Sequence, residues 1–248
     1  MRIIEKYKDD IMYFKIKDFE FENRFNHVFS SRIGWNQKDI FKDMSNIMEV
    51  REENIFRAKQ VHGSDVLIID NQSLKDISKE EKDGFVTNRK GIVLATYHAD
   101  CVPVYFYDRK KDVIGLAHAG WKGTLNNICG SIIEAMVEKF ESRAEDIIVA
   151  IGPSIGICCY EIGPDLVKLF SDKYPKEKDI ILEKESKVYL DLWKVNKINL
   201  LNLGVKEENI YYSNTCTSCK VDKLYSYRKE KGTNNRMIAA IGLKKRME

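Results

Sequence analysis

Three side chains with metal-binding chemistry stand at the ends of apolar runs in this chain. His62 lies in the string QVHG, Cys101 in HADCVPV and His118 in HAGWKG. Loops at strand ends are where α/β folds place ligand-binding groups, so these positions predict one shared site. Two histidines and one cysteine form a familiar zinc set that leaves a fourth position open, as catalytic zinc sites require. A water molecule in that position would have its pKa lowered towards neutrality.

Each of the three residues also has an ordinary interpretation. A histidine beside a buried strand is commonly a hydrogen-bonded core or surface residue, and a cysteine in an apolar run commonly packs as a small hydrophobic group. The intervals between the three residues are dozens of positions, unlike the short spacings of structural zinc fingers. The spacing therefore favours a catalytic site assembled from separate strands, as a hypothesis beside the structural interpretation.

The elements that must position these residues follow from hydrophobic periodicity. Apolar runs at Ile92–Tyr97, Val102–Tyr107 and within residues 112–123 predict strands on either side of the candidate ligands. Residues 56–70 are expected to form a further strand with His62 near its start. Thr124 is expected to cap a helix over Leu125–Phe140.

The remaining elements follow from the same patterns. Pro164 is expected at the start of a helix, because proline is favoured at the first helical position. Other helices are expected within residues 36–54 and over Leu192–Leu203. Residues 71–82 and 171–187 are predicted to be charged surface segments. Strands are expected within residues 11–16, 27–34, 147–156, 210–212 and 237–243.

Composition limits the class of protein. The chain has 248 residues, of which 44% are hydrophobic, and this suffices for one sizeable α/β domain. Its 41 basic and 38 acidic residues leave a net charge of +3, without the strong field of a nucleic-acid binder. No apolar run approaches the roughly 18 residues of a membrane span, and the charged N-terminus is unlike a signal peptide. We therefore expect a cytoplasmic protein with neither nucleic acid nor a membrane as partner.

Nothing in the sequence divides the chain. We find no internal repeat, no low-complexity tract and no linker rich in Pro, Gly or Ser, and four prolines in all argue against a flexible hinge. The sequence therefore predicts one mixed α/β domain over residues 1–248.

Six motifs resemble those of one known family. The strings are QVHG, HADCVPV, HAGWKGT, IGPSIGICCYEIG, LDLWKVN and the late CTSC…YSYR, in the family's order from about His27 to the C-terminus. They resemble the YfiH/YlmD-like family of laccase-domain, polyphenol-oxidase-like proteins. The resemblance implies a single layered α/β-β-α domain of mixed sheets. It also implies one zinc ion per chain, held by His62, Cys101 and His118.

The resemblance further implies purine nucleoside chemistry. The expected reactions are phosphorolysis of adenosine, inosine, guanosine and S-methyl-5′-thioadenosine, with adenosine deaminase activity as a second reaction. Purine nucleosides and phosphate are therefore the expected partners, while the oligomeric state, monomer or homodimer, stays open. The zinc-deaminase signature H-x-E…P-C-x-x-C is absent, so deamination would use a separate arrangement of residues.

Several residues near these motifs are candidates for binding substrate or for catalysis. Ser30 and Arg32 match residues at the family's substrate site, where an arginine suits phosphate through bidentate hydrogen bonds. Asp100 is a candidate catalytic carboxylate that orients a ligand or accepts a proton. Each candidate also fits an ordinary surface or core role. The other candidates are Arg57, Trp121 as a wall for the base, Lys122 for phosphate, Tyr160 and Arg228.

Two further residues leave alternatives open. His98 stands where the family often has threonine, and it is either a fourth nitrogen ligand or a bystander. Asp83, in Lys-Asp-Gly, is a plain turn signal, with a weakly supported role beside the zinc ligands.

The remaining cysteines have no assigned chemistry. Cys216 and Cys219 form a CxxC half-site, but no second CxxC exists, so a zinc ribbon is not supported and we interpret the pair as structural. Cys158 and Cys159 are adjacent and unsuited to an ordinary disulfide with each other.

Three rival functions compete with the zinc nucleoside enzyme. A copper polyphenol oxidase would need many histidine ligands, and the chain has four histidines in all. A cysteine hydrolase would use Cys101 as nucleophile and His118 as base. A binding module would hold a purely structural zinc with four protein ligands, for example including His98.

Overall fold

Two six-stranded sheets form the centre of the molecule. The computed structural model describes residues 2–20, 23–70 and 79–244. The first sheet consists of β1 (Ile3–Lys8), β2 (Ile11–Ile16), β3 (Phe25–Ser30), β4 (Ile55–Phe56), β7 (Val93–His98) and β14 (Met237–Leu243). The second consists of β5 (Val66–Ile68), β6 (Gly84–Thr87), β8 (Val102–Asp108), β9 (Val113–Ala119), β10 (Ile147–Ile151) and β13 (Ile210–Tyr212).

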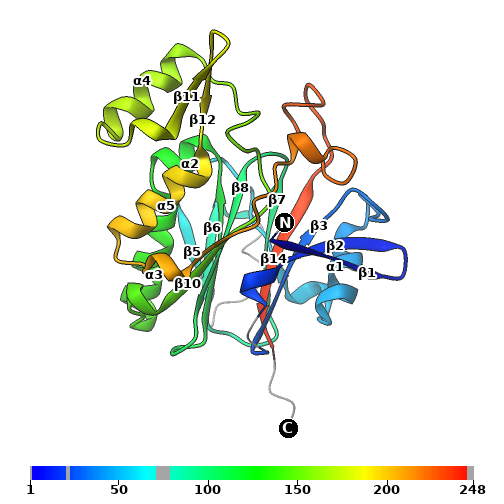
Figure 1. The fold of residues 1–248 in the computed structure, drawn as a ribbon. Coiled ribbons are helices and arrows are strands. Elements are labelled where there is room, and N and C mark those ends of the chain that lie inside the picture. The colour runs from blue at the N-terminus through cyan, green and yellow to red at the C-terminus, as the bar shows by residue number, and fades with distance from the viewer. Residues whose placement is uncertain (1, 21–22, 71–78, 245–248) are drawn as a thin grey trace.

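Both sheets mix antiparallel and parallel pairs. The strand order is β1-β2-β3-β14-β7-β4 in the first sheet and β13-β10-β8-β9-β6-β5 in the second. The pairs β4–β7, β5–β6 and β10–β13 are parallel, and the other pairs are antiparallel. A separate hairpin of β11 (Ile181–Lys184) and β12 (Lys187–Leu190) projects from one end of the molecule (Figure 1).

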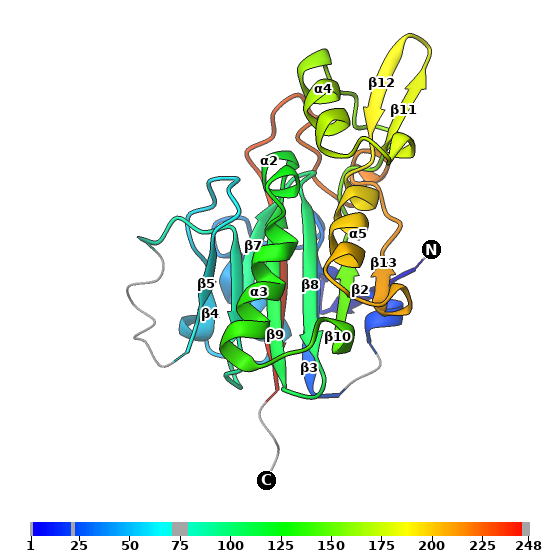
Figure 2. The same ribbon diagram turned by 90° about the vertical axis from the view of Figure 1, so that its left-hand side faces the viewer.

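Helices cover the outer faces of the two sheets. Helix α1 (Ile40–Met48) packs on the first sheet. Helices α2 (Trp121–Leu125), α3 (Ile128–Phe140) and α5 (Leu192–Asn202) cover the second sheet (Figure 2). Helix α4 (Pro164–Lys173) lies near the β11–β12 hairpin.

Alternation along the strands produces these layers. On β8, Val104 and Phe106 pack with the helices of the second sheet, while Tyr105 and Tyr107 pack between the sheets. This is the period of two that a strand with both faces buried requires. The result is a layered α/β-β-α fold of mixed sheets, which confirms the fold predicted from the sequence.

Helix α3 approaches the second sheet closely because two strand positions carry no side chain. A Cβ atom added at Gly84 on β6 would lie 3.0 Å from Cδ1 of Ile132, and one at Gly115 on β9 would lie 2.9 Å from Cγ2 of Ile132. Both distances are below ordinary van der Waals contact. The glycines therefore allow the helix to support the two strands that border the candidate site.

The predicted helix over Leu125–Phe140 needs correction. It is divided into α2 and α3, and Asn127 rather than Thr124 caps α3. The side chain of Asn127 accepts the N–H of Gly130 at 3.1 Å, and its φ of 61° is one that asparagine tolerates better than most residues.

Three other predicted elements also differ from the structure. Of the strand predicted over residues 56–70, only Phe56, the end of β4, and Val66–Ile68, which form β5, lie in strands, so His62 lies in the loop between them. The helix predicted within residues 36–54 spans only Ile40–Met48. The charged segment 171–187 contains the end of α4, all of β11 and the first residue of β12. Residues 71–78 of the other predicted surface segment lie outside the described residues.

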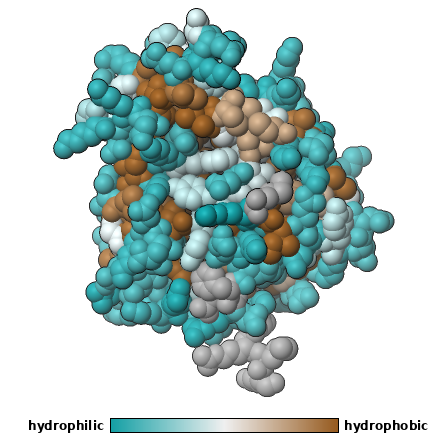
Figure 3. All heavy atoms as spheres, viewed as in Figure 1, coloured by the Kyte–Doolittle hydropathy of each residue, from teal (hydrophilic) through white to brown (hydrophobic). Residues whose placement is uncertain are grey.

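The surface is mostly polar where Figure 3 shows it. Hydrophobic residues gather at the upper end of this face, near α4 and the β11–β12 hairpin (Figure 3). Leu169 on α4 and Leu182 on β11 are exposed. Among the described residues, no helix combines the length and the apolar character that crossing a membrane demands.

Candidate metal centre

The pairing of β8 with β9 brings Cys101 beside His118. Cys101 immediately precedes β8, and His118 is the next-to-last residue of β9. The strands are antiparallel, with Pro103 opposite His118, so the start of one strand meets the end of the other. The ligand atoms of His62, Cys101 and His118 all lie within 4.8 Å of one another. The structure therefore brings together the three residues that the sequence proposes as metal ligands.

Asp83 lies opposite His118 on the neighbouring strand. Strand β6 is antiparallel to β9, with Gly84 opposite Ala117, so Asp83 comes next to His118. Its carboxylate is fully buried, and Oδ1 accepts the Nδ1–H of His118 at 2.7 Å. This leaves Nε2 of His118 for a metal ion. A carboxylate that orients a ligating imidazole in this way is the usual support of a metal-binding histidine.

The same carboxylate holds the loop that carries His62. Asp83 accepts three consecutive backbone N–H groups, at 3.0 Å from Val61, 3.0 Å from His62 and 2.8 Å from Gly63. His62 has a φ of 60°, in the left-handed region that few non-glycine residues adopt. Hydrogen bonds to Asp83 stabilise this unfavourable backbone conformation.

Gln60 ties the same loop to the first sheet. Its side chain donates to the carbonyl of Tyr97 at 2.9 Å and accepts the N–H of Tyr97 at 2.6 Å. The loop is therefore fixed to β7 on one side and to Asp83 on the other, although the His62 side chain itself is exposed. The centre is thus both positioned and reachable from solvent.

Gly120 leaves the space that the three ligands occupy. A Cβ atom at this position would lie 3.2 Å from Sγ of Cys101, 3.2 Å from Cδ2 of His62 and 3.9 Å from Cε1 of His118. The φ of Gly120 is −67°, an ordinary value for any residue. The requirement for glycine here is therefore one of space and not of backbone conformation.

The electrostatics of the centre suit a cation. Burial alone would raise the pKa of the Cys101 thiol, but His118 and His62 lower it. Burial alone would lower the pKa of His118, but the Cys101 sulfur and Asp83 raise it. For Asp83, burial is outweighed by hydrogen bonds from His118 and the backbone, so its pKa is lowered. The site favours a thiolate, and a metal ion can take the place of the proton that the histidines would otherwise share with it. The residues present therefore fit a metal ion.

His98 is not one of the clustered ligands. Its Nδ1–H donates to the carbonyl of Cys101 at 3.0 Å, and its Nε2 accepts the hydroxyl of Thr96 at 2.8 Å; this tautomer follows from the carbonyl acceptor. Burial holds the pKa of His98 well below its usual value. Both ring nitrogens are engaged, so His98 supports the Cys101 backbone and has no nitrogen left for a metal ion.

Asp100 connects the centre to a distant part of the chain. Its Oδ1 accepts the hydroxyl of Thr217 at 2.6 Å, and its Oδ2 accepts the backbone N–H of Arg228 at 2.7 Å. Its φ of 86° is in the left-handed region. Both oxygens have partners, so the carboxylate is suited to positioning residues 217–228.

Four other candidates lie around the centre. The guanidinium of Arg228 lies 5.2 Å from the ring centroid of Tyr160. Burial, and after it the Cys101 sulfur, raises the pKa of Tyr160 to about 12, which indicates that Tyr160 is near the metal residues. Trp121 directly follows Gly120, and Nζ of Lys122 lies 5.5 Å from the centroid of the Trp121 ring.

The other three candidates have partners elsewhere. Ser30 is fully buried, and its hydroxyl accepts the N–H of Ile238 at 2.8 Å. Arg32 pairs with Glu230 at 3.3 Å, and the guanidinium of Arg57 stacks 3.8 Å from the ring centroid of Phe41. The partners of these three side chains therefore lie outside the group formed by His62, Cys101 and His118.

A large open cleft of about 1290 Å³ lies apart from the centre. Its wall includes Lys15, Met48, Lys90 and Leu243, and no histidine or cysteine is among the described residues that line it. Among its described lining residues the cleft therefore offers no imidazole or thiolate ligand, and the candidate site is defined by its chemistry and not by the size of a cavity.

From the sequence, glycine at position 120 indicates only close backbone approach or a strained turn, and Asp83 only a turn with a weakly supported role beside the zinc ligands. What marks these two residues is their position relative to the strand that carries His118. Asp83 precedes the strand that pairs with the strand of His118, and Gly120 follows that strand by one residue. Reading this signal requires the order of strands in the sheet, which the chain order does not provide.

Comparison with known proteins shows extensive similarity. The family model described as multi-copper polyphenol oxidoreductase laccase matches residues 33–244. A protein of Geobacillus stearothermophilus named purine nucleoside phosphorylase YlmD is 36% identical over an alignment of 192 residues that covers 74% of this chain and 70% of that protein. A purine nucleoside phosphorylase of Rickettsia conorii is 32% identical over 94% of this chain and 97% of its own. The human protein named purine nucleoside phosphorylase LACC1 is 31% identical over 81% of this chain, which spans only 46% of the human protein.

Solved structures show the same fold. The crystal structure of YlmD from Geobacillus stearothermophilus superposes with a TM-score of 0.87 at 28% identity, covering 98% of this chain and 100% of that one. The hypothetical protein YfiH of Bacillus licheniformis superposes with a TM-score of 0.83 at 27% identity, covering 97% and 99%. The architecture of the described part of this chain is therefore that of these proteins.

Proposed function

Because this chain belongs to the laccase-domain family, which the sequence motifs predicted, we propose that it is a purine nucleoside phosphorylase. Relatives that align with most of this chain carry that name. The observation that carries the proposal is the convergence of His62, Cys101 and His118, with Asp83 orienting both the His118 ring and the His62 loop. We further propose that residues 1–248 form one catalytic domain and that the enzyme is cytoplasmic.

The proposed metal at this centre is one zinc ion. Bound zinc would supply a Lewis acid that polarises an oxygen of phosphate or water. Multicopper oxidase chemistry would need more histidines than the chain has. His27 and His98 are buried, and the Nε2 of His27 accepts the N–H of Ile16 at 2.8 Å. Two histidines and one cysteine match a mononuclear ion.

The proposed substrates are adenosine, inosine, guanosine and S-methyl-5′-thioadenosine. In phosphorolysis a phosphate oxygen bonds to C1′ of the ribose while the C1′–N9 bond breaks. The electron pair of that bond leaves with the purine, which takes up a proton. The exposed cations Arg228 and Lys122 are the residues that we propose bind phosphate and stabilise its charge.

Aromatic residues would bind the purine. The rings of Tyr160 and Trp121 are half-buried and offer flat faces for stacking. Because the pKa of Tyr160 is about 12, its hydroxyl stays protonated at neutral pH and can donate a hydrogen bond to a nitrogen of the leaving base. Asp100 would act by positioning Arg228 through its backbone.

Adenosine deamination is proposed as a second activity of the same pocket. A water oxygen would bond to C6 of the base, the C6–N bond would break and ammonia would leave.

A product assay tests both proposed activities. Purified protein of known zinc content would be incubated with adenosine, with and without phosphate, and the bases and nucleosides separated by chromatography. We expect adenine only when phosphate is present, and inosine as a second product. Cys101→Ala should lose this zinc ion and both products, while Cys129→Ser, which changes a cysteine outside the centre, should keep them. An enzyme with zinc at the centre but no turnover would reject the proposed substrates.

A cysteine hydrolase is the second candidate. The observation that favours it is the proximity of Cys101 and His118. His118 lowers the pKa of the Cys101 thiol, and the Cys101 sulfur raises the pKa of His118. Such an enzyme would stay active after zinc removal and would lose activity on thiol alkylation. The proposed zinc enzyme should instead lose its activity when a chelator removes the zinc ion.

A further inference from the structure

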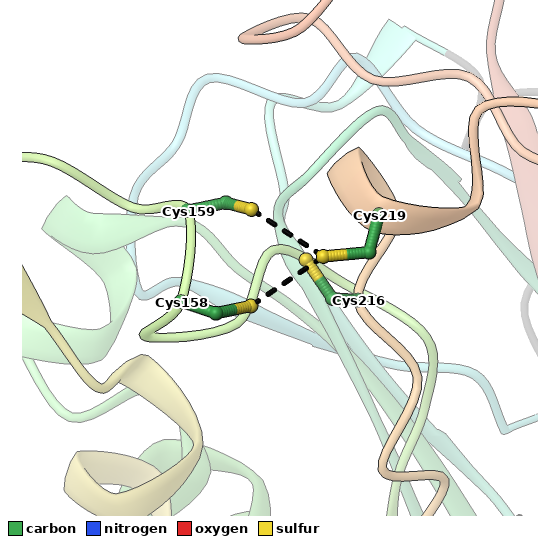
Figure 4. Close-up of side chains that lie close together, drawn as sticks. All are labelled: Cys158, Cys159, Cys216 and Cys219. Atoms are coloured by element: carbon green, nitrogen blue, oxygen red, sulfur yellow. Dashed lines mark hydrogen bonds between the residues drawn. The ribbon is translucent and has the colours of Figure 1, made fainter.

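Four cysteines from two distant parts of the chain meet outside the candidate metal centre. Two of them follow β10 in an adjacent pair, and the other two belong to the CxxC after β13. All four Sγ atoms lie within 4.8 Å of one another, and the side chains point towards a common point (Figure 4). We call this group the four-cysteine cluster, and it consists of Cys158, Cys159, Cys216 and Cys219.

The sulfur separations are those of a mononuclear metal site. Sγ of Cys219 lies 3.7 Å from Sγ of Cys158 and 3.5 Å from Sγ of Cys159. A tetrahedral ion with metal–sulfur bonds of about 2.3 Å places its sulfurs about 3.8 Å apart. A disulfide would need a sulfur–sulfur distance of about 2.05 Å, and all four cysteines are free thiols. The cluster therefore matches a metal tetrahedron and not a disulfide.

The backbone around the cluster is built to hold sulfur. The N–H of Gly156 donates to Sγ of Cys216 at 3.3 Å. A Cβ atom at Gly156 would lie 3.3 Å from Sγ of Cys158 and 3.5 Å from Cβ of Cys216, so the absence of a side chain lets the loop pack against both cysteines. Hydrogen bonds from backbone N–H groups to sulfur support ligating thiolates.

The two chain segments are also joined by backbone hydrogen bonds. Ser154 donates its N–H to the carbonyl of Thr215 at 3.1 Å, and Thr217 donates its N–H to the carbonyl of Ser154 at 3.0 Å. These bonds place the pair of adjacent cysteines opposite the CxxC. The second half-site that the sequence lacks as a CxxC is therefore supplied by Cys158 and Cys159.

We propose that the four-cysteine cluster binds one structural zinc ion, in addition to the ion at the candidate metal centre. Four thiolates are the ligand set of structural zinc sites, and they leave no open position for a reactant. An iron–sulfur cluster would fit less well, because its bridged irons hold the cysteine sulfurs further apart than one ion does. A divalent cation also offsets the repulsion among four thiolates at these separations. Cys158 and Cys219 are exposed, so an ion can enter from solvent.

The proposed ion would act as a clamp at the border of the catalytic centre. Thr217 lies between the two CxxC cysteines and donates to Asp100, the neighbour of Cys101. Tyr160 directly follows Cys159. A metal ion in the cluster would therefore hold in place both the segment that contacts Asp100 and the segment that carries Tyr160. The clamp does not depend on which reaction the enzyme catalyses.

Zinc content per chain tests the proposal. The full-length protein would be purified with zinc and a reductant, dialysed, and analysed by mass spectrometry of the metal. We expect about two zinc ions in the native protein and about one in each of Cys219→Ser and Cys101→Ala. Cys129→Ser changes a cysteine outside both sites and should keep two. One zinc ion in the native protein that disappears in Cys101→Ala would overturn the proposal.

A measurement on the native protein avoids dependence on variants that fail to fold. A thiol reagent would be added to the zinc-loaded protein while released zinc is followed with a chromogenic chelator. We expect the cluster thiols to react slowly, with one zinc ion released as four thiols are modified. Cobalt in place of zinc should show the intense charge-transfer bands of a tetrathiolate site. Cluster thiols that all react at once without zinc release, or an intact mass lower by two hydrogens that reveals a disulfide, would contradict the proposal.

Discussion

Asp83 is the residue on which the geometry of the candidate metal centre depends most. Its two oxygens accept one imidazole N–H and three backbone N–H groups, and the side chain is fully buried. A neutral amide at this position offers only one accepting atom and presents an NH₂ group to donors. Replacing the carboxylate therefore affects His118 and the His62 loop together.

We predict that Asp83→Asn weakens zinc binding at this centre by about 10- to 100-fold, the usual effect of removing a group that supports a metal ligand. Competition with a chelator of known affinity measures the change. Asp108→Asn is the matched control. Asp108 is also buried, but it ends β8, at the opposite end of that strand from Cys101, and it accepts the N–H groups of Lys110 and Lys111 in the turn that follows. Equal affinities in Asp83→Asn and the native protein would show that the carboxylate does not support the metal ligands.

His27 is a second buried residue whose charge matters, in this case for stability. Its Nε2 accepts the N–H of Ile16 at 2.8 Å, and burial, with a smaller effect of Lys15, lowers its pKa to about 3. In the unfolded chain the pKa is about 6.5. Between these two values the unfolded chain binds a proton that the folded protein does not, so the stability falls as the pH falls from 6.5 towards 3.

We predict that His27→Gln loses this part of the acid sensitivity. Between pH 7 and pH 5 the native protein should lose about 2 kcal/mol of unfolding free energy through His27, and the variant should lose that much less. Urea unfolding at the two pH values, at one fixed zinc concentration, measures the difference. Parallel losses in both proteins would mean that His27 is not neutral in the folded state.

At the scale of elements, strand register determines which residues meet. The pairing of β6, β9 and β8 places Asp83, His118 and Cys101 in a row along one edge of the second sheet. A shift of one residue would turn His118 to the opposite face of β9. Helix α2 then begins at once, with Gly120 as its N-cap, so the chain turns away from the ligands without a side chain to crowd them.

We predict that Gly120→Ala weakens zinc binding about tenfold while the protein still folds, because the added methyl group lies against Cys101 and His62. Chelator competition measures the affinity and thermal unfolding in excess zinc measures the fold. Gly163→Ala is the matched control, since a Cβ atom there meets nothing within 4 Å. Unchanged zinc affinity in Gly120→Ala would show that the ligands can shift at little cost.

At the scale of the whole molecule, residues 215–230 connect the candidate metal centre to the four-cysteine cluster. This segment contributes Cys216 and Cys219 to the four-cysteine cluster, and Thr217 and Arg228 to the bonds of Asp100. A disturbance in either place is therefore transmitted to the other through a few hydrogen bonds.

We predict that Thr217→Val lowers kcat/KM for adenosine phosphorolysis about tenfold and leaves the zinc content unchanged. The substitution keeps the shape of the side chain but removes the hydroxyl and leaves Oδ1 of Asp100 without its donor, a loss of about 1–3 kcal/mol. Thr215→Val is the matched control, because the hydroxyl of Thr215 bonds to the carbonyl of Ser213. If Thr217→Val and Thr215→Val had equal kcat/KM values, the hydrogen bond from Thr217 to Asp100 would not contribute to positioning the substrate site.

The sequence by itself determined which side chains could bind a metal ion and where most of the helices and strands lie. Continuous apolar runs predicted the strands that become β7, β8 and β9, because a strand buried on both faces must be apolar along its length. The proline at position 164 begins α4 as expected, because its fixed φ suits the first helical turn. The motifs identified the family and with it the layered fold.

Only the tertiary structure decided which of these groups meet. Asp83 and His118 are 35 residues apart, and Cys159 and Cys219 are 60 residues apart, so no local pattern relates them. Their contacts arise from the order and register of strands in the second sheet and from the loops that leave its edge. These depend on how whole layers bury their apolar faces, and that free energy is shared by the entire chain and is not contained in any short segment.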